Sequence, residues 1–289
     1  RRATTLEMTE HSDTGLQLQM LIAQLSDPHV MAAGELAFGR LDTGALLSQA
    51  VERVLRLDPL PDVVLLTGDL ADGGAPEPYA ELRRRLAPLP MALYLMPGNH
   101  DDRSALREAF PEADYLRQDP DFLHFDVDLG RLRLIALDSL VPGQVHGALC
   151  PRRLEWLAQR LEEQKDKPVV LAIHHPPFKT GIARMDAYGM LEGAEDFAEI
   201  VARHPQVERL LCGHLHRAIQ VRWAGTLAMT APSTAHQITF DLRPEAGLTM
   251  HMEPPGMLLH HWIEGQGLVS HLLPTGEFEG PLPFSSAAD

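Results

Sequence analysis

Five short segments of this sequence place metal-binding residue types directly after an apolar run. The segments are Asp27-Pro28-His29, Gly68-Asp69, Gly98-Asn99-His100-Asp101, His174-His175 and Gly213-His214-Leu215-His216. Imidazole, carboxylate and carboxamide groups suit Zn, Mn, Fe or Co, whereas a structural zinc site or an iron–sulfur cluster would favour cysteine. The segments therefore indicate a metal site built from oxygen and imidazole donors.

The candidate ligands are too numerous for one ion that keeps a position open for a reactant. They are Asp27, His29, Asp69, Asn99, His174, His214 and His216. Two ions about 3.5–4 Å apart that share a carboxylate would use the whole set, and such a pair can clamp both oxygens of an in-line phosphoryl displacement. Asp69 stands alone after its apolar run, so we expect it to bridge the two ions.

Each segment also has a simpler interpretation when it is taken alone. Asp-Pro-His and Gly-Asp occur in ordinary turns, because Asp, Pro and Gly favour turns on their own account. The two histidines of Gly213-His214-Leu215-His216 would lie on one side of an extended segment, as ligands of adjacent ions must. The recurrence of such residues after five apolar runs favours a metal site over five unrelated turns.

The apolar runs that precede these segments are short, which is typical of buried parallel strands. They cover residues 20–25, 63–67, 93–96, 169–173 and 210–212, and helices are predicted at 43–57, 78–86, 102–110, 152–164 and 194–203. Ligands bind beyond the carboxyl ends of strands in open α/β sheets, so these strand ends should meet at one crevice. We predict an α/β fold, a two-sheet sandwich flanked by helices, with a strand-rich C-terminal part.

In their order and surroundings, the five segments resemble the signature of the calcineurin-like metallophosphoesterase superfamily. Within it they are similar to the class III cyclic nucleotide phosphodiesterases and the bacterial glycerophosphodiesterases, through residues 21–29, 96–102, 172–178, 211–217 and 231–237. The resemblance implies an αββα sandwich over residues 20–240. It leaves residues 241–289 as a C-terminal extension, whose strands we expect to complete the second sheet or to form a small cap.

The resemblance also implies a role for each site residue. One ion would be held by Asp27, His29, Asp69 and His216, and the other by Asp69, Asn99, His174 and His214. Hydroxide from a metal-activated water would attack phosphorus without a covalent enzyme intermediate. His100, free of the metals, would protonate the leaving group or stabilise charge on the phosphoryl oxygens, and His236 would position the diester. His175 would be structural or would support the ligands without touching the metals. Asp101 would orient His100 or a ligand imidazole unless it is an exposed helix cap.

We therefore predict a metal-dependent phosphoric diester hydrolase with two divalent ions per chain, Mn, Fe, Zn or Co. Its substrates would be small phosphodiesters, 3′,5′-cyclic nucleotides such as cyclic AMP or glycerophosphodiesters, and residues 30–40, 178–190 and 240–256 would form the pocket walls. The alternatives are a broad-specificity phosphomonoesterase or protein phosphatase of the same superfamily, and a catalytically silent metal-binding scaffold. A silent scaffold should lack a ligand or His100, and the sequence has both.

Composition narrows the range of partners. The chain has 289 residues, 45% of them hydrophobic, and a net charge of −15, which argues against a general nucleic-acid surface. No segment is apolar enough to span a bilayer, and residues 1–19 lack the apolar core of a signal peptide, so we expect a disordered extension there and a cytoplasmic protein. Two cysteines, Cys150 and Cys212, make no disulfide framework. The resemblance implies a homo-oligomer, a dimer or higher.

Overall fold

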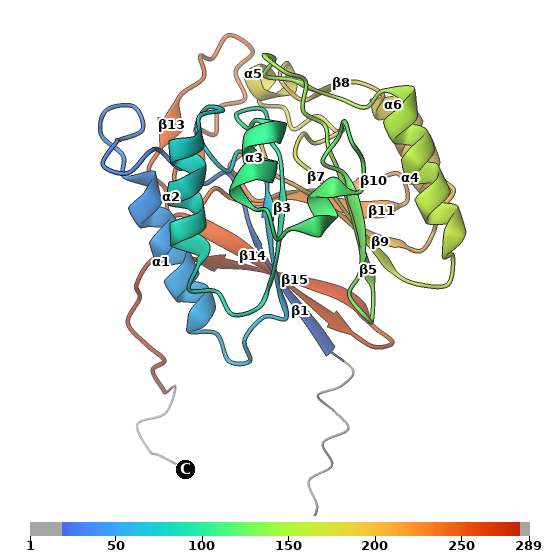
Figure 1. Ribbon diagram of the computed structural model, residues 1–289, viewed down its shortest axis with the longest axis horizontal. Helices are drawn as coiled ribbons and strands as arrows, with labels where there is room; N and C mark the ends of the chain where they lie inside the picture. The colour runs from blue at the N-terminus through green and yellow to red at the C-terminus, as the bar shows by residue number, and fades with distance from the viewer. Residues whose placement is uncertain (1–18, 284–289) are drawn as a thin grey trace, which may run out of the picture.

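Two β-sheets pack face to face in this protein, and helices cover the outer face of each sheet (Figure 1). The computed structural model describes residues 19–283, so the expected disordered extension lies outside the described residues except for Gln19, which begins the first strand. The predicted two-sheet α/β sandwich is confirmed.

The first sheet combines N-terminal strands with two strands from the C-terminal part, in the order β15-β14-β1-β2-β3. β1 (Gln19–Leu25), β2 (Val63–Thr67) and β3 (Ala92–Met96) are parallel, while β14 (Gly256–Ile263) and β15 (Gly267–Pro274) are antiparallel to their neighbours. The outer face is covered by α1 (Thr43–Leu55), α2 (Pro76–Leu86) and α3 (Arg103–Ala109).

The second sheet has the order β10-β11-β9-β7-β5-β4. β5 (Arg133–Leu137), β7 (Val169–Ile173), β9 (Val207–Cys212) and β11 (Thr226–Thr230) are parallel, and β4 (Phe125–Asp128) and β10 (Ile219–Trp223) are antiparallel edge strands. Its outer face is covered by α4 (Pro151–Glu163) and α6 (Ala194–Ala202).

Short elements connect these layers. They are the 3₁₀ helix Asp114–Arg117, α5 (Ala183–Asp186), β6 (Gly147–Ala148) paired with β8 (Met190–Glu192), and β12 (Gln237–Ile238) paired with β13 (Met250–His251). β12 begins only at Gln237, because the Ser233 hydroxyl accepts the N–H of Ala235 and of His236 and closes a turn there.

The alternation of side chains along each strand divides the apolar core into layers. In β2, Val64 and Leu66 contact the helical layer, while Val63 and Leu65 lie between the sheets. All five residues of this strand are buried. A parallel strand that is covered on both faces leaves its carboxyl end as the one place where polar side chains can gather, and that end faces the site described below.

The C-terminal strands β14 and β15 join the first sheet and do not complete the second, which was one of the two expected arrangements. β14 pairs with β1, and β15 extends the same sheet. β14 is apolar on both faces: Met257 joins the core under the helices, and Leu258 and Trp262 join the core between the sheets. The apolar residues of β14 indicate a strand that is buried on both faces, but a position in either sheet would bury it in this way.

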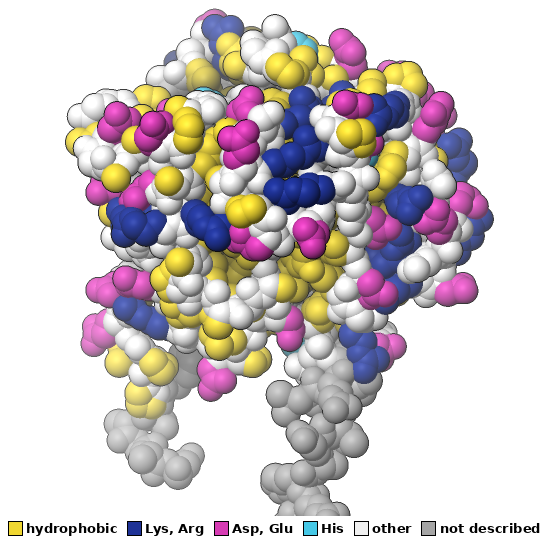
Figure 2. Space-filling model, in the orientation of Figure 1, with side chains coloured by type: hydrophobic (Ala, Val, Ile, Leu, Met, Phe, Trp, Pro, Cys, Tyr) yellow, Lys and Arg dark blue, Asp and Glu magenta, His cyan; other side chains and the backbone are white. Residues whose placement is uncertain are grey.

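The surface shows no large field of one sign on the face in Figure 2. Lys and Arg side chains gather near the region of α3, and Asp and Glu side chains are scattered around them (Figure 2). No helix among residues 19–283 is both long and apolar enough to cross a membrane.

Candidate metal centre

The loops that follow β1, β2, β3, β7 and β9 meet at one end of the sandwich and are joined by hydrogen bonds. Asp27 N–H donates to Gly68 O at 3.1 Å, and Gly213 N–H donates to His174 O at 3.1 Å. His174 Nδ1 lies 2.8 Å from Thr67 O and so connects the second sheet to the first. The predicted meeting of strand ends from both sheets is therefore present.

A first group of side chains comprises Asp27, His29, Asp69 and His216. All four are buried, and one potential ligand atom from each lies within 4.8 Å of the others. The two Nε2 atoms of His29 and His216 are 3.1 Å apart, His29 Nε2 is 3.6 Å from Asp69 Oδ2, and His216 Nε2 is 3.4 Å from Asp27 Oδ1. Imidazole nitrogens and carboxylate oxygens that converge in this way suit a divalent cation.

A second group forms around Asn99. Its Oδ1 lies 3.3 Å from His174 Nε2 and 3.1 Å from His214 Nδ1. His174 Nε2 is also 3.4 Å from Asp69 Oδ2, the same oxygen that approaches His29. Asp69 therefore lies between the two groups, while its other oxygen, Oδ1, accepts the backbone N–H of His100 at 2.9 Å.

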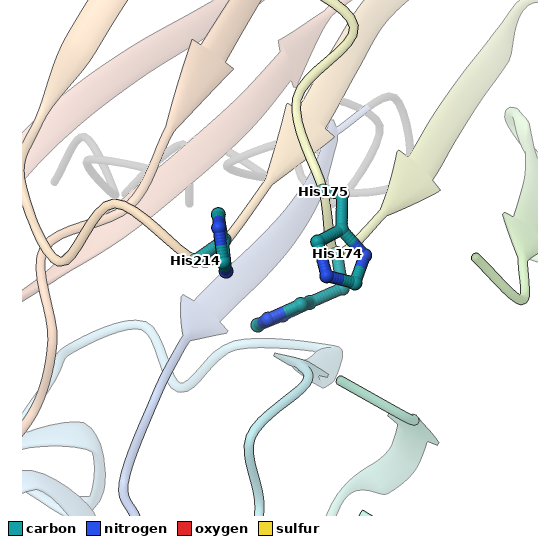
Figure 3. A group of neighbouring side chains, drawn as sticks. All are labelled: His174, His175 and His214. Atoms are coloured by element: carbon teal, nitrogen blue, oxygen red, sulfur yellow. The ribbon is translucent and has the colours of Figure 1, made fainter. Parts of the chain in front are cut away.

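His175 lies against this second group, with its ring centroid 4.7 Å from that of His214. Figure 3 shows His174 and His175 at the end of β7, near His214 on the loop after β9. The ring centroids of these three histidines lie 4.7 to 5.2 Å apart. The Nδ1 atom of His175 is hydrogen-bonded to Ser139 Oγ at 2.8 Å, and its buried Nε2 has no hydrogen-bond partner. His175 is thus fixed by Ser139 with its other nitrogen free.

The backbone adopts an unusual conformation at the candidate ligands. Positive φ angles occur at Asp27 (50°), His29 (45°), Asp69 (48°), His214 (70°) and His216 (51°). Among the described residues, only two further non-glycine residues have positive φ. Such conformations carry strain and persist where the surrounding structure imposes them, which is common at functional sites.

Two glycines of the motifs are required by close approach. A Cβ atom at Gly98 would lie 2.2 Å from Asp69 Oδ1, and one at Gly68 would lie 2.3 Å from His174 Nδ1. Neither neighbour can retreat, because both are buried within the ligand groups. Glycine at these positions therefore lets the backbone pass directly behind the ligands.

Asp101 has neither of its expected roles. It is buried and accepts hydrogen bonds from the N–H groups of Gly98 (2.8 Å) and Leu70 (3.0 Å) and from the hydroxyl of Tyr79 (3.0 Å). The exposed helix cap is Asp102, which accepts Ala105 N–H at 2.9 Å. Asp101 therefore joins the loop that carries Asp69 to the loop that carries Asn99.

Asp72 is a site residue that the sequence reasoning missed. Its Oδ1 lies 2.6 Å from His100 Nδ1, and the two side chains are 34% and 41% exposed. Burial lowers the pKa of His100, but the hydrogen bond with Asp72 and the charges of Asp69 and Asp72 outweigh it and raise that pKa to about 9. The signal available in the sequence was a second carboxylate three residues after Asp69.

His29, His214 and Asp69 have the protonation states that a cation requires, whereas His174, despite its burial, has its pKa raised to about 9 by the neighbouring carboxylate of Asp69. Burial lowers the pKa of His29 and of His214 to about 3, so both rings are neutral near pH 7 and have a free lone pair. Burial raises the pKa of Asp69, but His174 and His29 more than compensate and hold it well below its usual range. Asp69 is therefore an anion at the centre of the site.

His236 lies beside the first group of candidate ligands. Its ring centroid is 4.7 Å from that of His216 and 5.5 Å from that of His29, and its Nδ1 is buried without a hydrogen-bond partner. A cavity of about 260 Å³ opens beside it and is also lined by His100, Tyr188 and Leu248. The lining draws on all three segments that were expected to form the pocket walls.

The sequence is similar to a family model and to two known phosphodiesterases. The family model of calcineurin-like phosphoesterases matches residues 20–218. A probable glycerophosphodiester phosphodiesterase of Arcobacter nitrofigilis is 38% identical, with 92% of this chain and 97% of that protein covered. A 3′,5′-cyclic adenosine monophosphate phosphodiesterase of Pseudomonas aeruginosa is 33% identical, with 80% and 82% covered.

The fold is also found among solved structures. A dimetal phosphatase from Danio rerio superposes with a TM-score of 0.63 over 89% of this chain and 99% of that chain, at 14% sequence identity. At that identity the likeness concerns the sandwich architecture alone.

Proposed function

This chain belongs to the calcineurin-like phosphoesterase family, and we propose that it is a metal-dependent hydrolase of small phosphodiesters, either 3′,5′-cyclic nucleotides or glycerophosphodiesters. The observation that carries the proposal is the position of Asp69 Oδ2, which lies 3.6 Å from an imidazole of one ligand group and 3.4 Å from an imidazole of the other. A carboxylate shared in this way suits a pair of ions.

In this proposal the two groups hold one ion each. Asp27, His29, Asp69 and His216 would bind the first, and Asp69, Asn99, His174 and His214 the second. Mn, Fe, Zn and Co all suit this mixture of imidazole and oxygen donors. Divalent ions held there supply Lewis-acid polarisation of the phosphate and a water of low pKa.

His100 would handle the proton of the departing alcohol. Its Nδ1 is occupied by Asp72, so Nε2 is the atom that can donate to the leaving oxygen. The hydrogen bond with the Asp72 carboxylate favours the protonated form of the ring. His236, packed against His216 at the cavity wall, would position the diester.

The cavity favours a diester over a monoester. Among the described residues that line it, none is Lys or Arg. A diester carries one charge on its phosphate and a monoester close to two, and the described lining has no Lys or Arg to pair with the second charge. The phosphomonoesterase alternative is therefore disfavoured, and the silent scaffold is disfavoured because His100 lies in the cavity beside the complete ligand set.

The test uses protein loaded with Mn²⁺ and compares bis(p-nitrophenyl) phosphate with p-nitrophenyl phosphate. We expect a higher kcat/KM for the diester and two ions per chain by metal analysis, and a clear monoester preference would overturn the proposal. Cyclic AMP and glycerophosphoethanolamine, assayed side by side, then separate the two substrate classes. The same assay is applied to Asp69→Ala, which removes the shared carboxylate. Its control is Asp128→Ala, which removes a surface carboxylate paired with Lys167.

The remaining properties stay predictions. We expect a homo-oligomer, which light scattering can measure, and no nucleic-acid partner, because the net charge is −15. A cytoplasmic location is expected as well.

A further inference from the structure

Phe38 stands at the mouth of the cavity, in the connection between β1 and α1. Its side chain is 65% exposed, yet it lines the cavity that contains the ligand groups. The ring is perpendicular to that of His236, with an interplanar angle of 86° and centroids 5.3 Å apart. Part of the Phe38 ring is therefore in contact with His236, while most of the side chain is open to solvent.

The backbone at Phe38 is strained without an evident gain in packing. Its φ angle is 54°, a conformation that bulky side chains rarely adopt. The connection is closed at this point by hydrogen bonds from Ala37 N–H to Leu41 O (2.9 Å) and from Leu41 N–H to Ala37 O (3.0 Å). A side chain that is mostly exposed recovers little burial energy, so the fold gives no reason for a phenylalanine here.

The other walls of the cavity have the same chemical character. Val145, Tyr188 and Leu248 come from separate segments and line the cavity, and Val145 and Leu248 are 47% and 46% exposed. The carboxylate of Asp72 is already hydrogen-bonded to His100. Beyond the metal ligands, the described lining therefore offers apolar and aromatic surface and few free hydrogen-bonding groups.

We propose that Phe38 is a specificity-determining residue that receives, on its open ring, an apolar or aromatic group carried by one alcohol of the phosphodiester. This inference rests on the proposed diester hydrolysis and adds the kind of substrate. Diesters with such a group would be preferred over diesters of glycerol or other polyhydroxyl alcohols, because a polyhydroxyl group would lose its water against an apolar wall without gaining partners.

The experiment uses substrates that share the p-nitrophenyl leaving group and differ in the second alcohol. They are methyl p-nitrophenyl phosphate, benzyl p-nitrophenyl phosphate and p-nitrophenyl phosphorylcholine. The Mn²⁺-loaded full chain is compared with Phe38→Gly, Phe38→Tyr and the control Phe278→Ala. Phe278 is also 65% exposed and does not line the cavity. The measurements are kcat, KM and the melting temperature of each protein.

We expect the wild type to favour the benzyl over the methyl ester by about 10-fold, mainly through KM, since an aromatic contact contributes about that factor at most beyond area burial. Phe38→Gly should bring the ratio close to one, whereas Phe38→Tyr and Phe278→Ala should keep it. The melting temperature of Phe38→Gly should not fall, because glycine adopts a positive φ without strain. A residue with a merely structural role would not combine lost selectivity with retained stability.

Three results would overturn the inference: a benzyl preference that survives in Phe38→Gly, equal losses on all three substrates, or a loss that is largest for the choline ester. The last would assign the ring to a cationic group instead. If the wild type hydrolyses none of the three diesters, the proposed function itself fails, and that result differs from every outcome that concerns Phe38.

Discussion

Replacing Asp72 with Asn tests whether this carboxylate acts through His100. The hydrogen bond between them is 2.6 Å long and joins an anion to a ring whose pKa is raised to about 9. A hydrogen bond to a charged group contributes about 1.5–3 kcal/mol, which corresponds to a factor of about 10–150 in rate. Both side chains are more than one-third exposed, so solvent screening places the expected loss for Asp72→Asn at the lower end, about 10-fold.

The loss should depend on the leaving group. An alkoxide needs a proton in the transition state, whereas p-nitrophenolate scarcely does, so His100→Ala should lose about 10²–10⁴-fold on glycerophosphoethanolamine and much less on bis(p-nitrophenyl) phosphate. Asp72→Asn should likewise lose more activity on the alkyl diester than on the aryl diester, but each loss should be smaller than that of His100→Ala. In the double variant, Asp72→Asn should add nothing to the loss caused by His100→Ala, because its target ring is gone.

Additive losses in this double-mutant cycle would refute the reasoning and give Asp72 a role of its own. Equal losses on the alkyl and aryl diesters would assign His100 to charge stabilisation on the phosphoryl oxygens. Metal content serves as the control: His29, Asp72 and His100 could together hold a cation, so loss of an ion from His100→Ala would make this histidine a ligand.

Three further predictions concern the ligands and the scaffold. Asp69→Ala should be the most damaging ligand change and should lower the content of both ions in metal analysis; retention of two ions per chain would exclude Asp69 as the bridge. Gly98→Ala should abolish activity while the circular dichroism spectrum is kept, because the added Cβ would lie 2.2 Å from Asp69 Oδ1; near-normal turnover would contradict the close approach. His260 is buried and hydrogen-bonded to Gln24 and Ser270, and burial lowers its pKa from 6.5 to about 3. Between pH 3 and pH 6.5, His260 is therefore protonated in the unfolded chain but not in the folded chain. The contribution of His260 to the free energy of unfolding is therefore complete above pH 6.5 and decreases toward pH 3 by at most about 1.4 kcal/mol per pH unit. In urea unfolding, the free energy of unfolding of His260→Gln should fall less between pH 7 and pH 5 than that of the wild type. An equal fall in both proteins would contradict this.

The ligand groups could be predicted because their signal is local. Each candidate follows a strand directly, and a parallel strand that is buried on both faces fixes where its carboxyl end must lie. The residue type then shows which side chains can donate to a metal ion. His216, for example, lies in the first ligand group and His214 in the second. Nothing beyond a few consecutive residues was needed for this step.

The errors arose where a partner lies far along the sequence. Asp72 became recognisable only when the loop after β3 placed His100 beside it. Asp101 was expected to orient an imidazole, but its oxygens are taken up by Tyr79 and by backbone N–H groups of another loop. For β14, the apolar pattern indicated burial on both faces but did not choose between two sheets that would each provide it.

The pairing of β14 with β1 also determines when this protein can fold during its synthesis. β1 leaves the ribosome well before its partner on one side, Gly256–Ile263, which is made more than two hundred residues later. Until then one edge of β1 has unpaired backbone groups, and the apolar surface that Met257 and Trp262 will cover is open. We therefore expect the unit that can fold to extend beyond residues 20–218, the stretch that matches the family. A chain cut at residue 240 should aggregate, and adding residues 241–274 back should restore solubility together with the metal site.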